Sequence, residues 1–222
     1  MKIFTNLSLL LIVFSTITFT ACKKHDPDVV VKGEAKIKVV NAVTTEVNQD
    51  VYVDDAKLTT NALAYGDVTS YVKIASGMRN ISFTNSPAGS TSASMNFTPS
   101  ITYTTFLVSD RSGKREIVNY EDNLSNTEVG KAKVRLISLT QSFVTGINVS
   151  VQAGTQFVNA LAYKETSNYF SIDADINLRY TVVGSGNVKT IDNSKFSPGK
   201  IYTIWFSGTT AANLEAHVIA DN

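Results

Sequence analysis

The sequence contains little cysteine, histidine and proline, and it has no excess of either charge. Its 222 residues include one cysteine, two histidines and four prolines. A single cysteine excludes an internal disulfide, and with so few histidines a zinc site cannot be assembled. The 20 basic residues are scattered and stand against 19 acidic ones, so nothing predicts a nucleic-acid partner. Stability must therefore come from the core alone.

The first 21 residues have the three parts of a secretion signal. Lys2 supplies a positive charge, residues 7–19 are apolar apart from hydroxyl residues, and Ala21 supplies a small residue before Cys22. The apolar run is shorter than the ~20 residues that a transmembrane helix needs. We expect residues 1–21 to form a signal helix that is cleaved between Ala21 and Cys22.

The segment Phe19-Thr20-Ala21-Cys22 resembles the lipobox of bacterial lipoproteins. The resemblance implies that the Cys22 sulfur receives a diacylglyceryl group and that Cys22 becomes the new N-terminus. Several acyl chains anchor a protein stably, because each buried CH₂ contributes ~0.8 kcal/mol. The alternative is an ordinary leader followed by an incidental thiol. The resemblance predicts a lipid-anchored envelope protein, and Lys23, in place of an aspartate, favours the outer membrane.

Two long stretches of the chain repeat each other. Residues 61–65 and 159–163 both read Asn-Ala-Leu-Ala-Tyr, and flanking segments match at spacings of 97 to 99 residues. A solenoid repeats every ~20–50 residues, so this spacing indicates two copies of one domain. We predict a tether at residues 22–34, a first domain at 35–120, a polar linker at 121–130 and a second domain at 131–222.

The pattern beyond the leader is that of β-strands. In residues 35–39 and 132–136, apolar residues alternate with charges, as in strands with one buried face. Residues 103–108 and 201–206 are richer in aromatic and β-branched residues, which predicts central strands covered on both faces. About seven short strands per copy, separated by turn residues, predict an all-β protein of two tandem sandwiches.

Both copies resemble the bacterial family called domain of unknown function 4397. In the first copy the resemblance rests on residues 35–42, 50–54, 63–66, 70–74 and 103–108. It implies an immunoglobulin-like or transthyretin-like sandwich and a secreted or lipid-anchored location, with no established activity. The second copy departs from the pattern at Ser138, at residues 147–151 and at Lys164. A site built on those positions in the first copy therefore need not exist in the second.

Histidine chemistry has two candidates in this sequence. His25 lies in the tether, and His217 lies in an alternating strand near the C-terminus. A lone strand histidine is more often a packing or surface residue than a catalytic base. We therefore predict no catalytic residue and no cofactor.

Paired carboxylates are the remaining candidates for chemistry. Asp54-Asp55 is expected in a hairpin turn, Glu121-Asp122 at the start of the linker, and Asp173 and Asp175 at the end of a strand. A glycosidase would need two such groups facing each other across a cleft. Asp173 and Asp175 are also a weak candidate for a calcium site. The turn roles are favoured, and no metal site is predicted beyond that weak pair.

Tyrosines recur at equivalent positions of the two copies. Tyr65 and Tyr71 match Tyr163 and Tyr169. Since a buried tyrosine needs a partner for its hydroxyl, one interpretation is structural, with the ring packed and the hydroxyl holding a loop. The other is an aromatic platform that faces a sugar or peptide ligand. Retention in both copies favours the structural role, and Trp205 is expected in the core.

The favoured hypothesis is a non-catalytic lipoprotein of the cell envelope that binds or scaffolds a partner. The partner would be a glycan, a peptide or another envelope protein, held by loops or along an exposed edge strand. A structural subunit of an adhesin or fimbria, assembled by strand exchange, is the first alternative. A carboxylate-based hydrolase is the second, and it predicts two carboxylates that share a pocket.

Overall fold

The computed structural model describes residues 33–44, 47–85, 89–125 and 128–222. These residues belong to one compact unit, Val31–Asn222. The signal segment with its cleavage site at Ala21, the lipidation site Cys22, and His25 lie outside the described residues. Within them, no helix is both long and apolar enough to cross a membrane.

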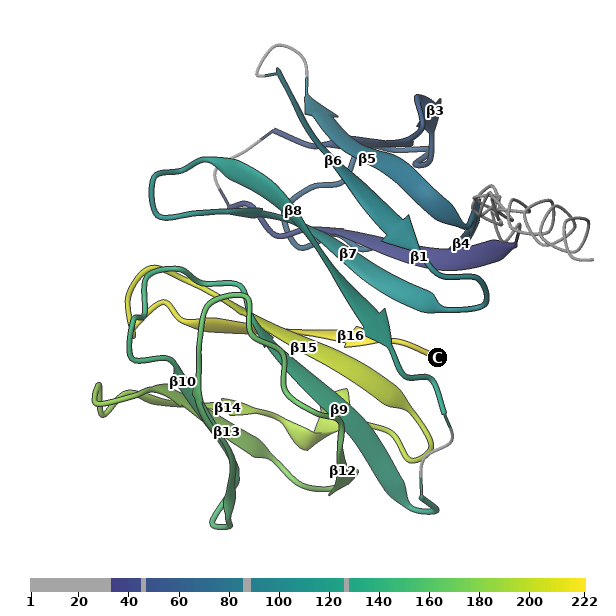
Figure 1. The fold of residues 1–222 in the computed structure, drawn as a ribbon. Helices are drawn as coiled ribbons and strands as arrows, with labels where there is room; N and C mark the ends of the chain where they lie inside the picture. Colours follow the sequence, from purple (N-terminus) through teal and green to yellow (C-terminus); the bar gives the residue numbers. More distant parts are fainter. Residues whose placement is uncertain (1–32, 45–46, 86–88, 126–127) are drawn as a thin grey trace, which may run out of the picture. The chain divides into compact units, whose positions relative to one another are not determined.

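The first half of the described chain contains eight strands in two four-stranded sheets (Figure 1). The strands are β1 (Glu34–Asn41), β2 (Asp50–Val53), β3 (Ala56–Lys57), β4 (Val72–Ala75), β5 (Gly77–Asn85), β6 (Gly89–Phe97), β7 (Thr102–Ser109) and β8 (Arg115–Asp122). One sheet has the order β4-β1-β7-β8 and the other has the order β3-β2-β5-β6. The apolar core of this half lies between them and includes Ile37, Phe83 and Phe97.

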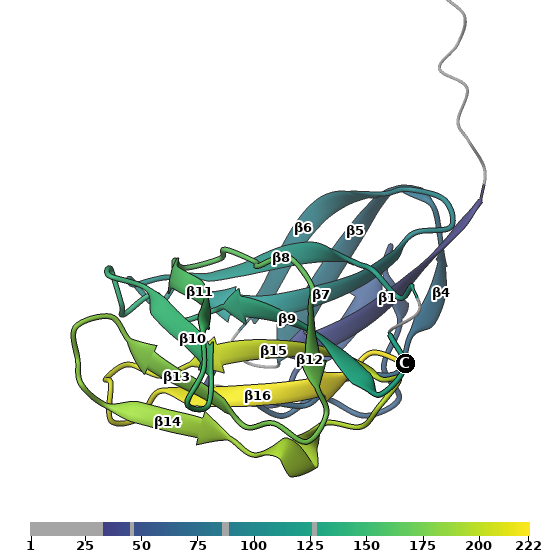
Figure 2. The same ribbon diagram turned by 90° about the horizontal axis from the view of Figure 1, so that it is seen from below.

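The second half repeats this topology. Its strands are β9 (Lys131–Ser138), β10 (Ile147–Val151), β11 (Gln156–Leu161), β12 (Phe170–Asp173), β13 (Leu178–Val182), β14 (Val188–Ile191), β15 (Ile201–Ser207) and β16 (Glu215–Ala220). The sheets β12-β9-β15-β16 and β11-β10-β13-β14 keep the strand order of the first half, and β9 and β15 lie side by side in Figure 2. The only helical element among the described residues is a short 3-10 helix, η1 (Asn193–Lys195). The prediction of an all-β protein with two sandwich-like halves is confirmed.

The central strands of both halves are buried on both faces, as predicted. β7 pairs in parallel with β1 and antiparallel with β8, and β15 makes the equivalent pairs with β9 and β16. Every residue of β15 is buried. One face of each strand covers the core of its own half. The other face needs a second cover, and the opposite half supplies it.

The charged face of the first strand of each half differs from the prediction. Lys38 in β1 and Arg135 in β9 alternate with apolar residues and were expected to face solvent, but both are almost fully buried. The strand pattern was correct, whereas the assignment of the polar face to water was wrong. The reason is the cover that the opposite half places over this face.

Of two carboxylate pairs that were predicted to lie in turns or linkers, one lies where it was predicted and the other does not. Asp54 and Asp55 form the turn between β2 and β3, with φ angles of 47° and 68°, as the hairpin prediction required. Aspartate tolerates this left-handed region better than most side chains. Glu121 and Asp122 were expected to open the linker, but they end β8. Their pairing with β7 extends the sheet by two residues, because Tyr103 and Thr102 lie opposite them.

Candidate functional site

The two halves share an apolar cluster that belongs to neither sandwich core. Val40 and Phe106 from the first half and their repeat equivalents Ile137 and Trp205 from the second half are fully buried in it. The rings of Phe106 and Trp205 meet edge to face, with centroids 6.1 Å apart. The junction between the halves is therefore packed like a protein interior.

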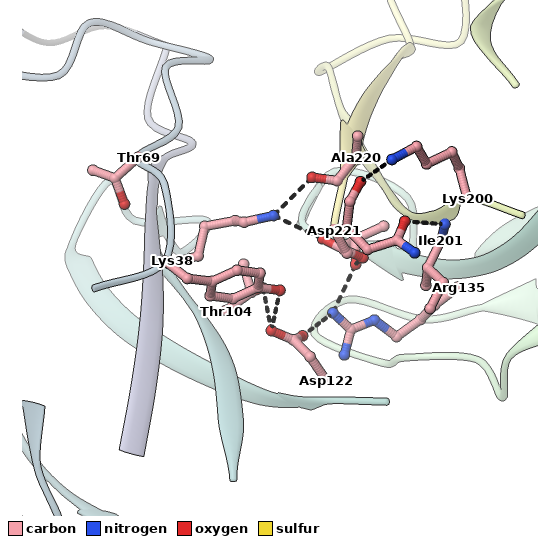
Figure 3. Close-up of polar contacts among 12 residues, drawn as sticks. Lys38, Thr69, Thr104, Asp122, Arg135, Lys200, Ile201, Ala220 and Asp221 are labelled. Atoms are coloured by element: carbon pink, nitrogen blue, oxygen red, sulfur yellow. Dashed lines mark hydrogen bonds and ion pairs between the residues drawn. The ribbon is translucent and has the colours of Figure 1, made fainter. Parts of the chain in front are cut away.

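Two buried ion pairs connect the halves across this junction. The Lys38 ammonium lies 3.0 Å from Asp221, and the Arg135 guanidinium pairs with Asp122 (Figure 3). Lys38 and Arg135 are equivalent positions of the repeat, and so are Asp122 and Asp221. Each half thus offers its cation to the acid of the other half. This reciprocity is the arrangement of an interface between two identical subunits related by a two-fold axis, built here within one chain.

The Asp122 carboxylate is the better satisfied of the two acids. It accepts hydrogen bonds from the Tyr71 hydroxyl and the Thr104 hydroxyl, both at 2.8 Å, in addition to its pair with Arg135. Arg135 also donates to the Thr203 hydroxyl at 2.7 Å. Its side chain and that of Asp122 are 2% and 0% exposed, so neither charge has water to replace a lost partner.

The Asp221 carboxylate lies just after β16 and also has a cation from the opposite half and a threonine from its own half, but no tyrosine hydroxyl among the described residues. It accepts from Lys38, and from the Thr203 hydroxyl at 2.7 Å. Lys38 also donates to the carbonyl oxygen of Ala220 at 2.9 Å, and its ammonium lies 4.3 Å from the centre of the Tyr71 ring. Thr203 therefore links the two ion pairs, because its hydroxyl accepts from Arg135 and donates to Asp221.

The tyrosines beside these pairs are shifted by burial. Burial raises the pKa of Tyr169 to about 12 and raises the pKa of Tyr71 further above its ordinary value. Burial also raises the pKa of Asp122, while the Arg135 guanidinium acts in the opposite direction. Tyr71 therefore stays a proton donor to Asp122. Tyr169, with the Arg135 guanidinium 5.1 Å from its ring, accepts from the backbone N–H of Asn123.

Equivalent turns position the other two repeated tyrosines. In the first half the backbone N–H of Ala64 donates to the Asp67 carboxylate at 2.8 Å, and this turn carries Tyr65. In the second half the N–H of Ala162 donates to the Glu165 carboxylate at the same distance, and that turn carries Tyr163. Each tyrosine then reaches into the opposite half.

The two tyrosine hydroxyls meet different groups there. The Tyr163 hydroxyl donates to the Glu116 carboxylate at 2.9 Å and to the carbonyl oxygen of Ser109. The Tyr65 hydroxyl lies 2.7 Å from the Ser207 hydroxyl and 3.1 Å from Nε2 of His217. Hence all four sequence candidates, Tyr65, Tyr71, Tyr163 and Tyr169, lie at the junction and have hydroxyl partners.

His217 stacks on the only tryptophan of the chain. Its ring is nearly parallel to that of Trp205, with centroids 3.8 Å apart, and Nε2 lies 2.9 Å from the Ser207 hydroxyl. Burial lowers the pKa of His217, although the Glu215 carboxylate beside it acts in the opposite direction. A neutral imidazole that carries its proton on Nδ1 accepts at Nε2. Ser207 can then donate to His217 while Tyr65 donates to Ser207.

A cavity of about 300 Å³ opens next to this cluster. It lies where β1, β7, β9 and β15 end, and residues from both halves line it. Tyr65 and Ser207 contribute to the lining, together with Thr140, Asn213 and Glu215. Sequence reasoning missed this site, since it assigned His217 a packing or surface role and did not single out Ser207. The available signal was the repeat itself, because Val108 and Val118 occupy the equivalent positions in the first half.

Of the two candidate calcium ligands, the Asp173 carboxylate is paired with a lysine. Asp173 forms an ion pair with Lys131 at 2.6 Å, and the carbonyl oxygen of Asp175 accepts from the Asn193 side chain. Across the described part of the chain, no group of three or more histidine, cysteine, aspartate or glutamate side chains is placed to hold a metal ion.

Comparison with family models gives a match for the first part of the chain. A family model described as "Domain of unknown function (DUF4397)" matches residues 35–144. No curated protein matches the chain significantly. The matched segment covers the first half, the connection and β9, and it stops in the loop after that strand; the resemblance of the second copy to the same family stays a prediction. Residues 35–144 thus carry one DUF4397 domain, a family whose description assigns no activity.

Proposed function

We propose that this protein is a lipid-anchored, non-catalytic binding or scaffolding protein of the cell envelope, on the outer membrane. The location is inferred from the sequence, in which a signal-like segment is followed by Ala21 and Cys22. Cys22 would carry the lipid. Its partner would be a glycan, a peptide or another envelope protein, and no cofactor is required.

The reciprocal ion pairs at the junction are the observation that carries this proposal. Lys38, Asp122, Arg135 and Asp221 are buried, and each charge is paired across the two halves. A buried pair adds little net stability compared with packed apolar residues, and we infer that these two pairs fix one arrangement of the halves. A fixed pair of sandwiches on a tether suits a protein that holds a partner in a constant geometry.

The carboxylates at the junction do not favour the hydrolase alternative. Asp122 and Asp221 are connected through two residues, because Arg135 pairs with Asp122 and donates to Thr203, and Thr203 donates to Asp221. Both side chains are 0% exposed, so a substrate has no access to them. A glycosidase needs its two carboxylates on a cleft where they flank the bond to be cut.

A specific observation keeps the structural-subunit alternative open. Strand β6 lies at the edge of its sheet and contains no charged residue and no proline. Its counterpart β14 is four residues long, contains Lys189 and is followed by η1. Charges and short length are the usual devices that prevent strand addition at an edge. The β6 edge lacks them, which suits assembly by added strands.

Lipid attachment is tested by labelling the full-length protein with a fatty-acid analogue in the native host. The expected result is label on the wild-type protein, recovery with the outer-membrane fraction, and loss of both in Cys22→Ser. Ser90→Ala, a change on the exposed face of β6, is the matched control and should behave as wild type. Label that persists in Cys22→Ser would contradict the lipid anchor.

Binding is tested separately with the immobilised mature chain and envelope extract. We expect a component that is retained by wild type and lost in Arg135→Ala, in which one junction pair is broken. If the purified protein instead forms linear polymers whose growth is blocked by Ser92→Lys on β6, the structural-subunit alternative is favoured.

A further inference from the structure

The polar groups that line the cavity at the junction indicate which class of ligand it can bind. It collects hydroxyl groups and side-chain amides from the ends of strands in both halves. The polar residues that line it, apart from Tyr65, Ser207 and Glu215, are Thr44, Ser109, Thr140, Gln141, Thr209 and Asn213. Hydroxyls and amides both donate and accept hydrogen bonds, which is what a ligand rich in hydroxyl groups requires.

The charge of the cavity disfavours anionic ligands. Among the described residues that line it, Glu215 is the only charged one, and none is a lysine or an arginine. An anionic ligand would meet this carboxylate, and no described lining residue supplies a cation to pair with it, so it would bind more weakly than a neutral ligand. The Glu215 side chain is 62% exposed, so it can turn toward a ligand and accept from its hydroxyl groups.

The residues at the base of the cavity differ from those at the equivalent positions of the first half. The repeat places Val108 and Val118 in the first half where the second half has Ser207 and His217. The first half folds with valines at these positions, so the fold itself does not require a polar pair. The hydroxyl oxygens of Tyr65 and Ser207, both in the lining, lie 2.7 Å apart in a hydrogen bond, and Nε2 of His217 lies 2.9 Å from the Ser207 hydroxyl behind them. This chain fixes the directions of two hydroxyl groups at the cavity wall.

We propose that the cavity binds a neutral saccharide unit of a glycan. The inference rests on the proposed binding function and names its ligand class and its site. Tyr65 and Ser207 would bond the sugar hydroxyls from the base, while Glu215 would accept from hydroxyls at the rim. A volume of about 300 Å³ matches the lower end of small-molecule sites, which suits one or two sugar rings.

The test titrates the mature wild-type chain with four neutral disaccharides: maltose, cellobiose, lactose and N,N′-diacetylchitobiose. Binding is followed by calorimetry and by the fluorescence of Trp205, the only tryptophan, which stacks on His217. We expect saturable millimolar binding of at least one of them. Ser207→Val, which installs the residue of the first half, should weaken it by about tenfold, the value of one buried hydrogen bond. Ser90→Val on β6 is the matched control and should leave binding unchanged.

Glu215→Gln provides a second variant in case Ser207→Val does not fold, because Glu215 is exposed. The wild type should bind the uronic-acid form of the preferred disaccharide more weakly than the neutral form, and Glu215→Gln should reduce that difference. Failure of all four sugars to bind, or equal binding by wild type and Ser207→Val, would overturn the inference. Lipid labelling of Cys22 and capture of an envelope component would be unaffected, so a failure here is distinguishable from failure of the proposed function.

Discussion

The two halves of this protein share one topology, yet they differ in the residues on the sheet face that packs against the opposite half. Where the first half has Val108 and Val118, the second half has Ser207 and His217, with the histidine stacked on Trp205. The ion pairs, in contrast, are the same in kind on both sides: Lys38 with Asp221, and Arg135 with Asp122. The symmetric residues hold the halves together, and of the asymmetric ones Ser207 lines the cavity while His217 lies behind it.

This difference separates residues that the junction requires, the paired charges, from positions where it accepts either apolar or polar residues. A buried charge requires a partner, so a change in one half would have to be matched in the other. A valine can be exchanged for a polar residue only where a partner is available, and Tyr65 supplies one at 2.7 Å from Ser207. The cavity therefore lies at a point of the junction where the two copies of the repeat differ.

The largest effect is expected when one reciprocal pair is broken. Arg135→Ala leaves the Asp122 carboxylate buried without its cation, although Tyr71 and Thr104 still donate to it. We expect the free energy of unfolding to fall by about 3–5 kcal/mol in urea titrations. Lys73→Ala, which removes an exposed pair with Glu34, is the control and should cause no measurable change. A loss as small as that of the control would show that the buried pair does not hold the halves.

A smaller effect is expected when both members of the other pair are removed together. Lys38→Met and Asp221→Leu each leave one partner unpaired, whereas the double variant leaves no unpaired charge. The double variant should lose less free energy of unfolding than the two single variants lose in sum, and the difference, the coupling energy, should be about 0.5–3 kcal/mol. Additive losses in the urea titrations would mean that the two side chains contribute independently.

The smallest effect concerns pH and the asymmetric histidine. Burial lowers the pKa of His217, so the unfolded chain takes up its proton more readily than the folded chain. Stability from this residue is present above its unfolded pKa of about 6.5 and is lost as the pH falls toward the folded value. His217→Val, which copies the first half, should lose less stability than wild type between about pH 7.5 and pH 5 in thermal melts. Equal losses in both proteins would contradict a buried, neutral histidine.

Much of the fold could be predicted from the sequence. Strand alternation at residues 35–39 and 132–136, and the spacing of 97 to 99 residues, identify strands and two copies. The mixed aromatic and β-branched strands at 103–108 and 201–206 indicate two covered faces. Such local patterns report burial, because each side chain must match the surroundings that its strand gives it.

The junction could not be predicted from the same patterns. Alternation places Lys38 and Arg135 on a polar face but does not tell whether that face meets water or another domain. Asp122 and Asp221 recur at a spacing of 99 residues, yet their partners lie in the opposite copy, 183 residues away for Lys38 and Asp221. One sequence carries no record of such long-range pairing. The cavity is lined by residues of both halves, so it was missed as well.

Hydrogen exchange measured by mass spectrometry on wild type and Arg135→Ala tests the central claim most directly, namely that the reciprocal pairs join the halves into one cooperative unit. Peptides that cover β7 and β8 report on the first half, and peptides that cover β9 and β15 report on the second. The account predicts that the single change in β9 accelerates exchange in both sets of peptides. Acceleration confined to β9 and β15, with β7 and β8 protected as in wild type, would contradict it.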